Sequence, residues 1–314
     1  MILTLTVNPA IDRTVITDRI NYEDRVYVRS SFEQAGGKGI NAALVVQGLG
    51  APVLALATSG GPTGKLLAEL LQVSGLPIAL IPIRNAIRRN LTVSDLQGLT
   101  IKLDETGPEI SPAEEKRIER MTRERLDGAK WLLLCGSLPP GMSPDFYARL
   151  IRIAREKNVR TLLDTGGEAL RLGLAARPAM VKPNRQEAER LLERPLLTRQ
   201  HSLEALREIA RMGAEMVVLS LGSDGAMGVS GGGSGNGSYH AHAPEIKLAC
   251  PIGAGDALAA TVVWSLAQGH TFPEALQWGV AAGTAAAATA GTSFASFTET
   301  QQLRERVHVE ELAS

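Results

Sequence analysis

The sequence predicts an α/β protein with a doubly wound, mostly parallel sheet, helices on both faces of that sheet and a small additional β-sheet. Short apolar runs of strand length alternate with amphipathic runs of helix length as far as Ser220, which is the pattern of βαβ units. The C-terminal third is helical instead. Two extended segments of alternating polarity interrupt the rhythm, and they account for the additional sheet.

The strands of the parallel sheet are expected at residues 2–7, 53–57, 131–135, 159–163, 180–182 and 216–220. The helices are expected at residues 63–73, 144–156, 168–174, 185–192, 202–212, 254–268, 273–290 and 298–307. Pro273 suits the first position of its helix, where no backbone N–H is needed.

The two extended segments, residues 13–32 and 90–103, are expected to form a small antiparallel sheet. We expect this sheet to project as a lid from a single domain of residues 1–314. Apolar side chains on both segments would leave exposed strand edges on a monomer, which predicts a homodimer through the lid. The glycine- and serine-rich tract of residues 230–238 is expected to be a flexible hairpin tip.

Composition argues against several classes of function. The 33 basic residues equal the 33 acidic ones, so no net charge attracts nucleic acid or an anionic membrane. Two isolated cysteines, Cys135 and Cys250, fit a reducing compartment. The N-terminus shows no basic region or cleavage site, and the apolar stretch of residues 279–291 is too short to span a bilayer. We therefore expect a cytoplasmic protein that binds neither nucleic acid nor membrane.

Two early glycine-rich loops resemble nucleotide-binding motifs but lack a required residue. Gly37, Gly39 and Ala42 satisfy the G-x-G-x-x-A pattern of dinucleotide-binding proteins, yet residues 57–62 contain no carboxylate for the ribose. A second loop is similar to a P-loop, but Leu66 stands where Ser or Thr must hold magnesium. A strand-to-helix turn explains that second loop better.

A later loop combines small residues with a carboxylate. Gly253, Ala254 and Gly255 let consecutive backbone N–H groups converge at the start of a helix, where the helix dipole also favours an anion. Asp256 follows immediately. This aspartate is either the N-cap of the helix or a group with a chemical role beside the anion site.

Three further features follow predicted strands. Lys182 supplies a cation, and Asn184 and Glu187 share a helix face on which they can orient hydrated magnesium. The alternative is that Asn184 caps the helix and Glu187 is a solvated charge. The glycine-rich turn of residues 220–225 suits close approach of a nucleotide, or is an ordinary hairpin turn. Asp12 lies just past the carboxyl end of a parallel strand, where open α/β sheets bind ligands.

With these residues in place, the chain resembles the ribokinase-like sugar kinases, in their phosphofructokinase B branch, over nearly its whole length. The matching pieces, in chain order, are residues 8–12, 36–41, 136–141, 182–184 with Glu187, 220–222 with Gly225, and 253–256. The resemblance implies the ribokinase-like fold and a kinase that depends on ATP and Mg²⁺.

The resemblance also implies a role for individual residues. It places in the sugar-phosphate site Asp12, Gly37, Lys38, Asn41, Arg88 and Ser137. It assigns to ATP Lys182, Asn184, Glu187, Ser220, Gly222 and Gly225, with Mg²⁺ held through water by Asn184 and Glu187. It makes Gly253, Ala254 and Gly255 the anion hole and Asp256 the base that deprotonates the sugar hydroxyl.

Positive charge near the acceptor site indicates which class of sugar binds. Lys38 and the pair Arg88-Arg89, together with Arg25, supply more positive charge than a neutral sugar needs, so they suit a sugar that already carries a phosphate. By resemblance the expected acceptor is fructose 1-phosphate, which gives fructose 1,6-bisphosphate. The alternatives are a 6-phosphofructokinase, a tagatose-6-phosphate kinase, and a non-catalytic sugar- or nucleotide-binding regulator on the same fold.

Two positions depart from the family pattern. Tyr27 stands where the minor 6-phosphofructokinase has a basic residue, and the nearby Arg25 could substitute for it. Thr289 stands where some relatives have an Asn near a monovalent-cation site. A potassium requirement therefore does not follow from the resemblance.

Overall fold

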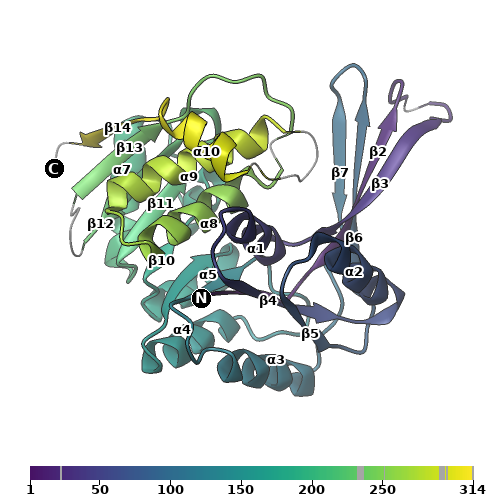
Figure 1. The fold of residues 1–314 in the computed structure, drawn as a ribbon, viewed down its shortest axis with the longest axis horizontal. Coiled ribbons are helices and arrows are strands. Elements are labelled where there is room, and N and C mark those ends of the chain that lie inside the picture. The colour runs from purple at the N-terminus through teal and green to yellow at the C-terminus, as the bar shows by residue number, and fades with distance from the viewer. Residues whose placement is uncertain (22, 232–236, 251, 290–293, 295, 313–314) are drawn as a thin grey trace.

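A ten-stranded sheet forms the centre of the computed structural model, which describes residues 1–21, 23–231, 237–250, 252–289, 294 and 296–312 (Figure 1). The strand order is β14-β13-β12-β11-β10-β9-β8-β1-β4-β5. The strands are β1 Ile2–Thr6, β4 Val53–Ser59, β5 Ile78–Pro82, β8 Trp131–Cys135, β9 Arg160–Asp164, β10 Met180–Val181, β11 Met216–Ser220, β12 Ala226–Ser230, β13 Gly237–His242 and β14 His308–Leu312. Neighbours from β11 to β5 are parallel, whereas β12, β13 and β14 extend one edge in antiparallel pairs.

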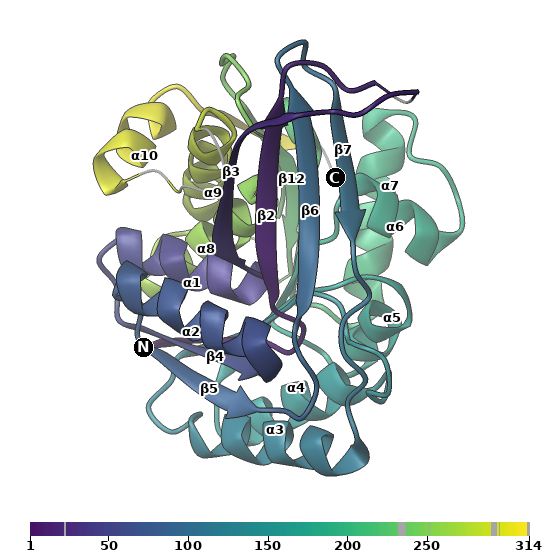
Figure 2. The same cartoon turned by 90° about the vertical axis from the view of Figure 1, so that its right-hand side faces the viewer.

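Helices cover both faces of this sheet, with α1, α8 and α9 on one face and α5, α6 and α7 on the other (Figure 2). The helices are α1 Lys38–Gly48, α2 Gly61–Ser74, α3 Pro112–Glu124, α4 Phe146–Glu156, α5 Gly167–Ala175, α6 Arg185–Leu192, α7 Arg199–Arg211, α8 Ala254–Ala267, α9 Phe272–Ala287 and α10 Phe297–Arg304. The two-sided cover explains why every residue of the central strands β1 and β8 is buried and almost all of them are apolar.

The second sheet stands beside the main sheet and has the order β3-β2-β6-β7. Its strands are β2 Ala10–Thr17, β3 Val28–Gly36, β6 Arg88–Asp95 and β7 Thr100–Asp104. Two antiparallel hairpins, β2–β3 and β6–β7, join through a parallel pairing of β2 with β6. The expectation of a purely antiparallel sheet is therefore wrong. Strands β2 and β6 both begin at the main body and run away from it, so they pair in parallel.

Most of the predicted elements of the main sheet are confirmed, and the strands at 131–135 and 216–220 and the helix at 185–192 have the expected bounds. Pro273 is the second residue of α9 rather than the first, which still costs no intrahelical hydrogen bond. The helix expected to reach residue 307 ends at Arg304, and the edge strand β14 follows it. The sequence patterns do not indicate β5, α3 or β14.

The tract of residues 230–238 connects β12 to β13, which form an antiparallel hairpin as expected. Its residues 232–236 lie outside the described residues. Cys135 and Cys250 are both free thiols. Within the described ranges we find no helix that is both long and apolar enough to cross a membrane.

The burial of β8 predicts a large stability cost for truncating its central side chain. Leu133 is fully buried, so Leu133→Ala should lower the free energy of unfolding by about 2–5 kcal/mol. Val73, which is 90% exposed at the end of α2, gives the control, because Val73→Ala should change it by less than about 0.5 kcal/mol. Urea denaturation measures both variants. Equal effects would contradict the placement of β8 at the centre.

Candidate active site

Side chains from four separate parts of the chain meet at the carboxyl end of the parallel strands. Asp164 is the last residue of β9, and Lys182 directly follows β10. Lys38 and Asn41 lie in the first turn of α1, and Asp256 lies in the first turn of α8. Parallel strands end on the same side of a sheet, which is why residues this far apart in sequence become neighbours.

The carboxylate of Asp164 bridges two lysines. Its Oδ1 accepts a hydrogen bond from Nζ of Lys38 at 2.9 Å, and its Oδ2 lies 3.3 Å from Nζ of Lys182. The side chains of Asp164 and Lys182 are only 1% and 4% exposed. Burial alone would raise the pKa of Asp164, but the ammonium groups of Lys182 and Lys38 hold it below its ordinary value. Asp164 therefore stays ionised in a nearly dry part of the protein.

Asp256 is the third residue of α8. Gly253, with a φ of 82° in the left-handed region, is the N-cap of this helix, so the N-cap interpretation of Asp256 is wrong. Oδ2 of Asp256 accepts a hydrogen bond from Nδ2 of Asn41 at 2.8 Å. Burial and the nearby charge of Asp164 raise the pKa of Asp256 to about 6. A carboxylate with that pKa is ionised at neutral pH and is well matched to accept a proton there.

The N-terminus of α8 and the ammonium group of Lys182 supply the kind of groups that bind an anion. The first backbone N–H groups of a helix have no intrahelical partner, and the helix dipole makes that end positive. A Cβ added to Gly255 would lie 3.6 Å from Nζ of Lys182, so the ammonium group approaches the first turn closely. The first backbone N–H groups of α8 and the carboxylate of Asp256 thus lie in one helix turn.

Asn184 and Glu187 form a capping box at the start of α6. Oδ1 of Asn184 accepts from the backbone N–H of Glu187 at 2.9 Å, and Oε2 of Glu187 accepts from that of Asn184 at 2.8 Å. Asn184 is therefore a helix cap, as the alternative expects. Glu187 is not merely a solvated charge, because its Oε1 lies 3.6 Å from Nζ of Lys38. Their role toward magnesium stays a prediction.

The glycine-rich turn after β11 lies beside this capping box. Asn184 forms an isolated parallel bridge with Ser220. The turn then continues as a single 3₁₀ turn, Gly222–Asp224, followed by Gly225. A Cβ at Gly225 would lie 2.1 Å from the carbonyl oxygen of Ala241, so only glycine fits there. The predicted nucleotide residues of both loops are thus neighbours.

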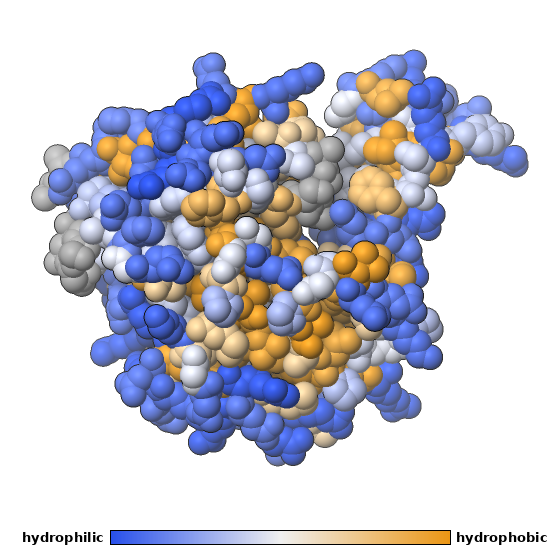
Figure 3. Space-filling view, in the orientation of Figure 1, coloured by the Kyte–Doolittle hydropathy of each residue, from blue (hydrophilic) through white to orange (hydrophobic). Residues whose placement is uncertain are grey.

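A cavity of 820 Å³ opens between this network and the base of the second sheet. Its polar and charged lining includes Asn8, Lys38, Arg88, Asp104, Thr106, Ser137, Glu187 and Arg190. Figure 3 shows the second sheet as a separate lobe with a notch between it and the main body.

The first residues of β2 and β6 supply polar groups at the foot of the second sheet. Oδ1 of Asp12 accepts a hydrogen bond from Nδ2 of Asn90 at 2.8 Å, and the carboxylate lies over Gly36. Burial raises the pKa of Asp12, against the opposing effects of Asn90 and Arg88. Nη1 of Arg88 donates to the carbonyl of Glu105, while its buried Nε has no hydrogen-bond partner among the described residues.

The structure brings some of the predicted acceptor residues together and leaves one apart. Lys38, Arg88 and Ser137 line the same cavity, and Gly37 is the N-cap of α1. Arg25 does not line it: this exposed residue lies on the connection between β2 and β3, at the end of the second sheet remote from the cavity. In a single chain Arg25 therefore does not converge with the other cations.

Three site residues are missing from the sequence-based assignment. Asp164 holds the two lysines, Asn90 orients Asp12, and Nδ2 of Asn8 donates to Oγ of Ser137 at 3.1 Å. Asp164 ends an apolar strand directly before Thr-Gly-Gly, a position equivalent to that which draws attention to Asp12. The position of Asp164 at the end of a predicted strand could therefore have identified it from the sequence. Asn90 has no such signal, because its role depends on the pairing of β6 with β2.

The fold and the site are those of one class of protein: an α/β phosphotransferase that acts on a sugar hydroxyl, with a buried carboxylate beside a helix N-terminus. The family profile described as pfkB family carbohydrate kinase matches residues 5–300, and the chain belongs to this family.

Its relatives include phosphofructokinases of two kinds. ATP-dependent 6-phosphofructokinase isozyme 2 of Escherichia coli is 33% identical, over 96% of this chain and 97% of that protein. The 1-phosphofructokinase of Rhodobacter capsulatus is 34% identical, over 87% and 86% of the two chains. A crystal structure of E. coli phosphofructokinase-2 in complex with potassium has a TM-score of 0.90 and 32% identity, and covers 97% of this chain and 98% of that one.

The environment of Asp256 predicts a pH dependence. If this carboxylate is the base, kcat/KM should fall as the pH falls through about 6, because Asp256 becomes protonated. The hydrogen bond from Asn41 stabilises the ionised form, so Asn41→Ala should move this acidic limb to higher pH. Asn85→Ala is the control, since the Asn85 amide donates to the carbonyl of Glu109 away from the network. An acidic limb that stays in place in Asn41→Ala would show that Asp256 does not control it.

Proposed function

We propose that this chain transfers the γ-phosphoryl group of ATP to a phosphohexose, with Asp256 as the base that accepts the proton of the attacking hydroxyl. The observation that carries the proposal is the position of Asp256: a buried carboxylate in the same helix turn as an anion site. A carboxylate at that position repels an anion, so its presence there indicates a chemical role. Acceptance of the proton from a sugar hydroxyl is such a role.

The residues present fit ATP and magnesium. The first turn of α8, with Gly253 and Gly255, and the ammonium group of Lys182 are positioned for a polyphosphate. Glu187 uses Oε2 in the capping box, and its Oε1, which lies 3.6 Å from Nζ of Lys38, would hold a hydrated magnesium ion together with the amide oxygen of Asn184, since Mg²⁺ in such sites keeps several of its waters. Magnesium, when bound, would neutralise charge on the phosphates.

The chain's own groups then divide the work of phosphoryl transfer. Asp256 accepts the hydroxyl proton, a contribution of about 10²–10⁴-fold for a positioned base. The backbone N–H groups of residues 253–255 and Lys182 stabilise charge on the transferring group. Asn41 fixes the direction of the Asp256 carboxylate, and Asp12 is placed to accept hydrogen bonds from sugar hydroxyls.

The acceptor is assigned to the phosphohexoses because three cations, Lys38, Arg88 and Arg190, line the cavity. Arg88 keeps a buried Nε–H without a partner among the described residues, which suits a phosphate oxygen. Lys38 lines the same cavity, although its ammonium group is paired with Asp164. The choice of fructose 1-phosphate over fructose 6-phosphate stays a prediction from the sequence, and relatives named for each sugar have similar identity.

Potassium forms no part of this proposal. A related structure holds potassium, but in this chain the hydroxyl of Thr289 donates to the carbonyl of Ala285 at 3.0 Å, and residues 290–293 lie outside the described residues.

We further propose that the second sheet serves as a lid and as the contact of a homodimer. Its base supplies Asp12 and Arg88 to the site, so a movement of the sheet would open and close the cavity. The sheet and its connections carry exposed apolar side chains, visible in the upper right lobe of Figure 3. Tyr27, Val28, Phe32 and Leu103 are 77%, 55%, 41% and 58% exposed.

Asp256→Asn tests the base directly. The amide keeps the shape of the side chain but accepts no proton, so kcat should fall by about 10²–10⁴-fold while the affinity for ATP is retained. A coupled ADP-release assay measures turnover, and calorimetry measures nucleotide binding. Near-normal turnover would rule out Asp256 as the base.

Arg88→Ala tests the acceptor class. Loss of one charge-assisted phosphate contact should cost about 1.5–3 kcal/mol, which is roughly one to two decades in kcat/KM on the phosphorylated sugar. Any residual activity on free fructose should change far less. Fructose 1-phosphate, fructose 6-phosphate and tagatose 6-phosphate should be compared on the wild type. A preference for fructose 6-phosphate would correct the isomer, and a preference for an unphosphorylated sugar would overturn the acceptor class.

Light scattering tests the dimer. The wild type should be dimeric at micromolar concentration, and Phe32→Lys should shift it toward monomer by placing a charge in the contact. Val73→Lys, on the exposed end of α2, should leave the dimer intact. A wild type that is monomeric at micromolar concentration would remove the dimer proposal and leave the lid untouched.

A further inference from the structure

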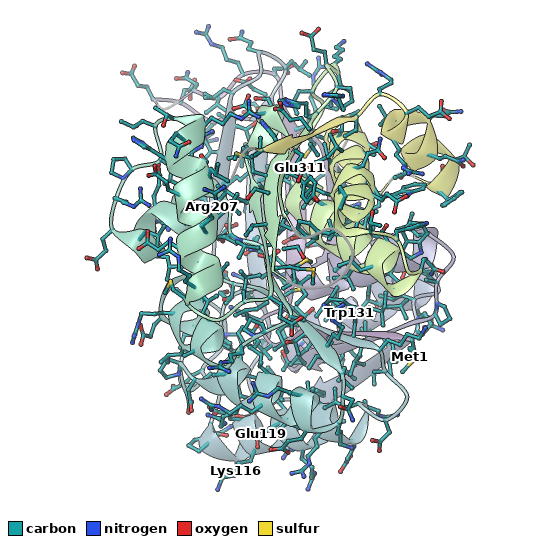
Figure 4. All side chains as sticks on the ribbon, turned by 90° about the vertical axis from the view of Figure 1, so that its left-hand side faces the viewer. Met1, Lys116, Glu119, Trp131, Arg207 and Glu311 are labelled. Carbon is teal, nitrogen blue, oxygen red and sulfur yellow. The ribbon has the colours of Figure 1, made fainter. Side chains whose placement is uncertain are left out.

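Histidines and a glutamate gather on the antiparallel edge of the main sheet, away from the cavity. In the register of β13 and β14, His240 faces Glu310 and His242 faces His308. Side chains two residues apart on a strand point to the same face, so these four residues form two adjacent cross-strand pairs on one face. Figure 4 shows this side of the molecule, with Glu311 of β14 and Arg207 of α7 labelled.

His240 has an unused, buried nitrogen directed toward this cluster. Its Nε2 lies 2.9 Å from the backbone carbonyl oxygen of Asp224. A carbonyl only accepts, so Nε2 carries the hydrogen and a neutral ring keeps its lone pair on Nδ1. Nδ1 lies 3.8 Å from Oε1 of Glu310, is buried and makes no hydrogen bond within the described residues. His240 itself is only 7% exposed.

The other ligand atoms are close to Nδ1 of His240. Nε2 of His242 lies 2.8 Å from Oε1 of Glu310, and one ligand atom from each of the three residues lies within 4.8 Å of the others. In a tetrahedral site with bonds of about 2.0–2.1 Å the ligand atoms are roughly 3.3 Å apart. Small side-chain rotations therefore suffice to bring these three atoms around one ion. His308 stacks next to His242, with ring centroids 6.1 Å apart.

We propose that β13 and β14 carry a binding site for a divalent transition-metal ion of the zinc class, with His240, His242 and Glu310 as its ligands. Imidazole and carboxylate are the ligand set that Zn²⁺, Ni²⁺ and Cu²⁺ accept, whereas Mg²⁺ prefers oxygen ligands alone. A metal-bound histidine typically donates its second ring N–H to a backbone carbonyl, and His240 already does so to Asp224.

Arg199 is the natural competitor of the ion. Its guanidinium group at the start of α7 pairs with Oε1 of Glu310, the same oxygen that faces both histidines. A bound dication displaces this guanidinium group from Oε1. Arg199→Gln should therefore strengthen metal binding, an effect opposite to that of removing a ligand.

The site is separate from the proposed phosphoryl-transfer site but is joined to it by one hydrogen bond. Asp224 belongs to the 3₁₀ turn Gly222–Asp224, whose glycine is predicted to approach ATP. A metal ion that holds the ring of His240 in place also holds the group that donates a hydrogen bond to the carbonyl oxygen of Asp224 in this turn.

Cobalt(II) tests the site on the tag-free, full-length protein without nucleotide. Calorimetry should show one saturable Co²⁺ site per chain, and the visible spectrum should show the intense bands of a four-coordinate nitrogen–oxygen site. Zn²⁺ should bleach these bands, and excess Mg²⁺ should not. His242→Ala and Glu310→Gln, both partly exposed and tolerant of substitution, should each weaken binding at least about tenfold.

Two controls distinguish this site from other imidazole and thiol groups that could bind Co²⁺. His270→Ala removes an imidazole that bonds to Ser265 elsewhere, and Cys250→Ser removes a partly exposed thiol; both should bind Co²⁺ like the wild type. Binding that is lost in Cys250→Ser, binding unchanged in His242→Ala, or no saturable site in the wild type would each overturn the proposal.

Discussion

Two lysine ammonium groups reach the buried carboxylate of Asp164 from separate elements, one on each of its oxygens. A buried ion pair contributes little net stability, but removing one partner typically costs about 3–5 kcal/mol because the other charge is left uncompensated. Asp164 therefore keeps Lys38 and Lys182 in place at the carboxyl end of the sheet. Burial raises the pKa of Asp256, and the negative charge of Asp164 raises it further. The positions of both cations depend on Asp164, and so does part of the proton affinity of Asp256.

The architecture explains how this cluster forms. The carboxyl ends of parallel strands bring Asp164 and Lys182 to one edge, while α1 and α8 pack together and direct Asn41 toward Asp256. The second sheet starts directly after β1, and its strand β6 brings Arg88 to the cavity that Lys38 also lines. Lys38 belongs to the Asp164 cluster, so this cavity lies against that cluster. In the proposed reaction, a sugar phosphate bound there would have its reacting hydroxyl near Asp256 and its own phosphate near Arg88.

How far the sequence could predict this site depends on the range of each interaction. Asp256 and residues 253–255 form a local motif, so the helix N-terminus was accessible from the sequence. The pair Asn184 and Glu187 was accessible too, although the pattern alone cannot separate a capping box from a magnesium site, and the structure shows the capping box. The partnership of Asp164 with Lys38 spans 126 positions in sequence and has no local signature.

The second sheet shows the same limit. Extended segments are visible in the sequence, but the parallel pairing of β2 with β6 depends on both strands leaving the main body in the same direction. Arg25 was grouped with Lys38 and Arg88 because of its charge, and only the length of β2 and β3 separates it from them. The histidines of β13 and β14 become neighbours only once β14 joins the sheet edge.

The most direct test of the central role of Asp164 is a carboxyl-carbon NMR titration of Asp256, which requires no turnover. In protein labelled at the aspartate carboxyl carbon, the Asp256 signal is assigned by its loss in Asp256→Asn. The account predicts that Asp256 titrates at about pH 6 in the wild type. In Asp164→Asn it should titrate at lower pH, because the repelling negative charge of Asp164 is gone. A wild-type pKa near the ordinary value for aspartate, or a pKa of Asp256 that does not fall in Asp164→Asn, would contradict the role given to Asp164.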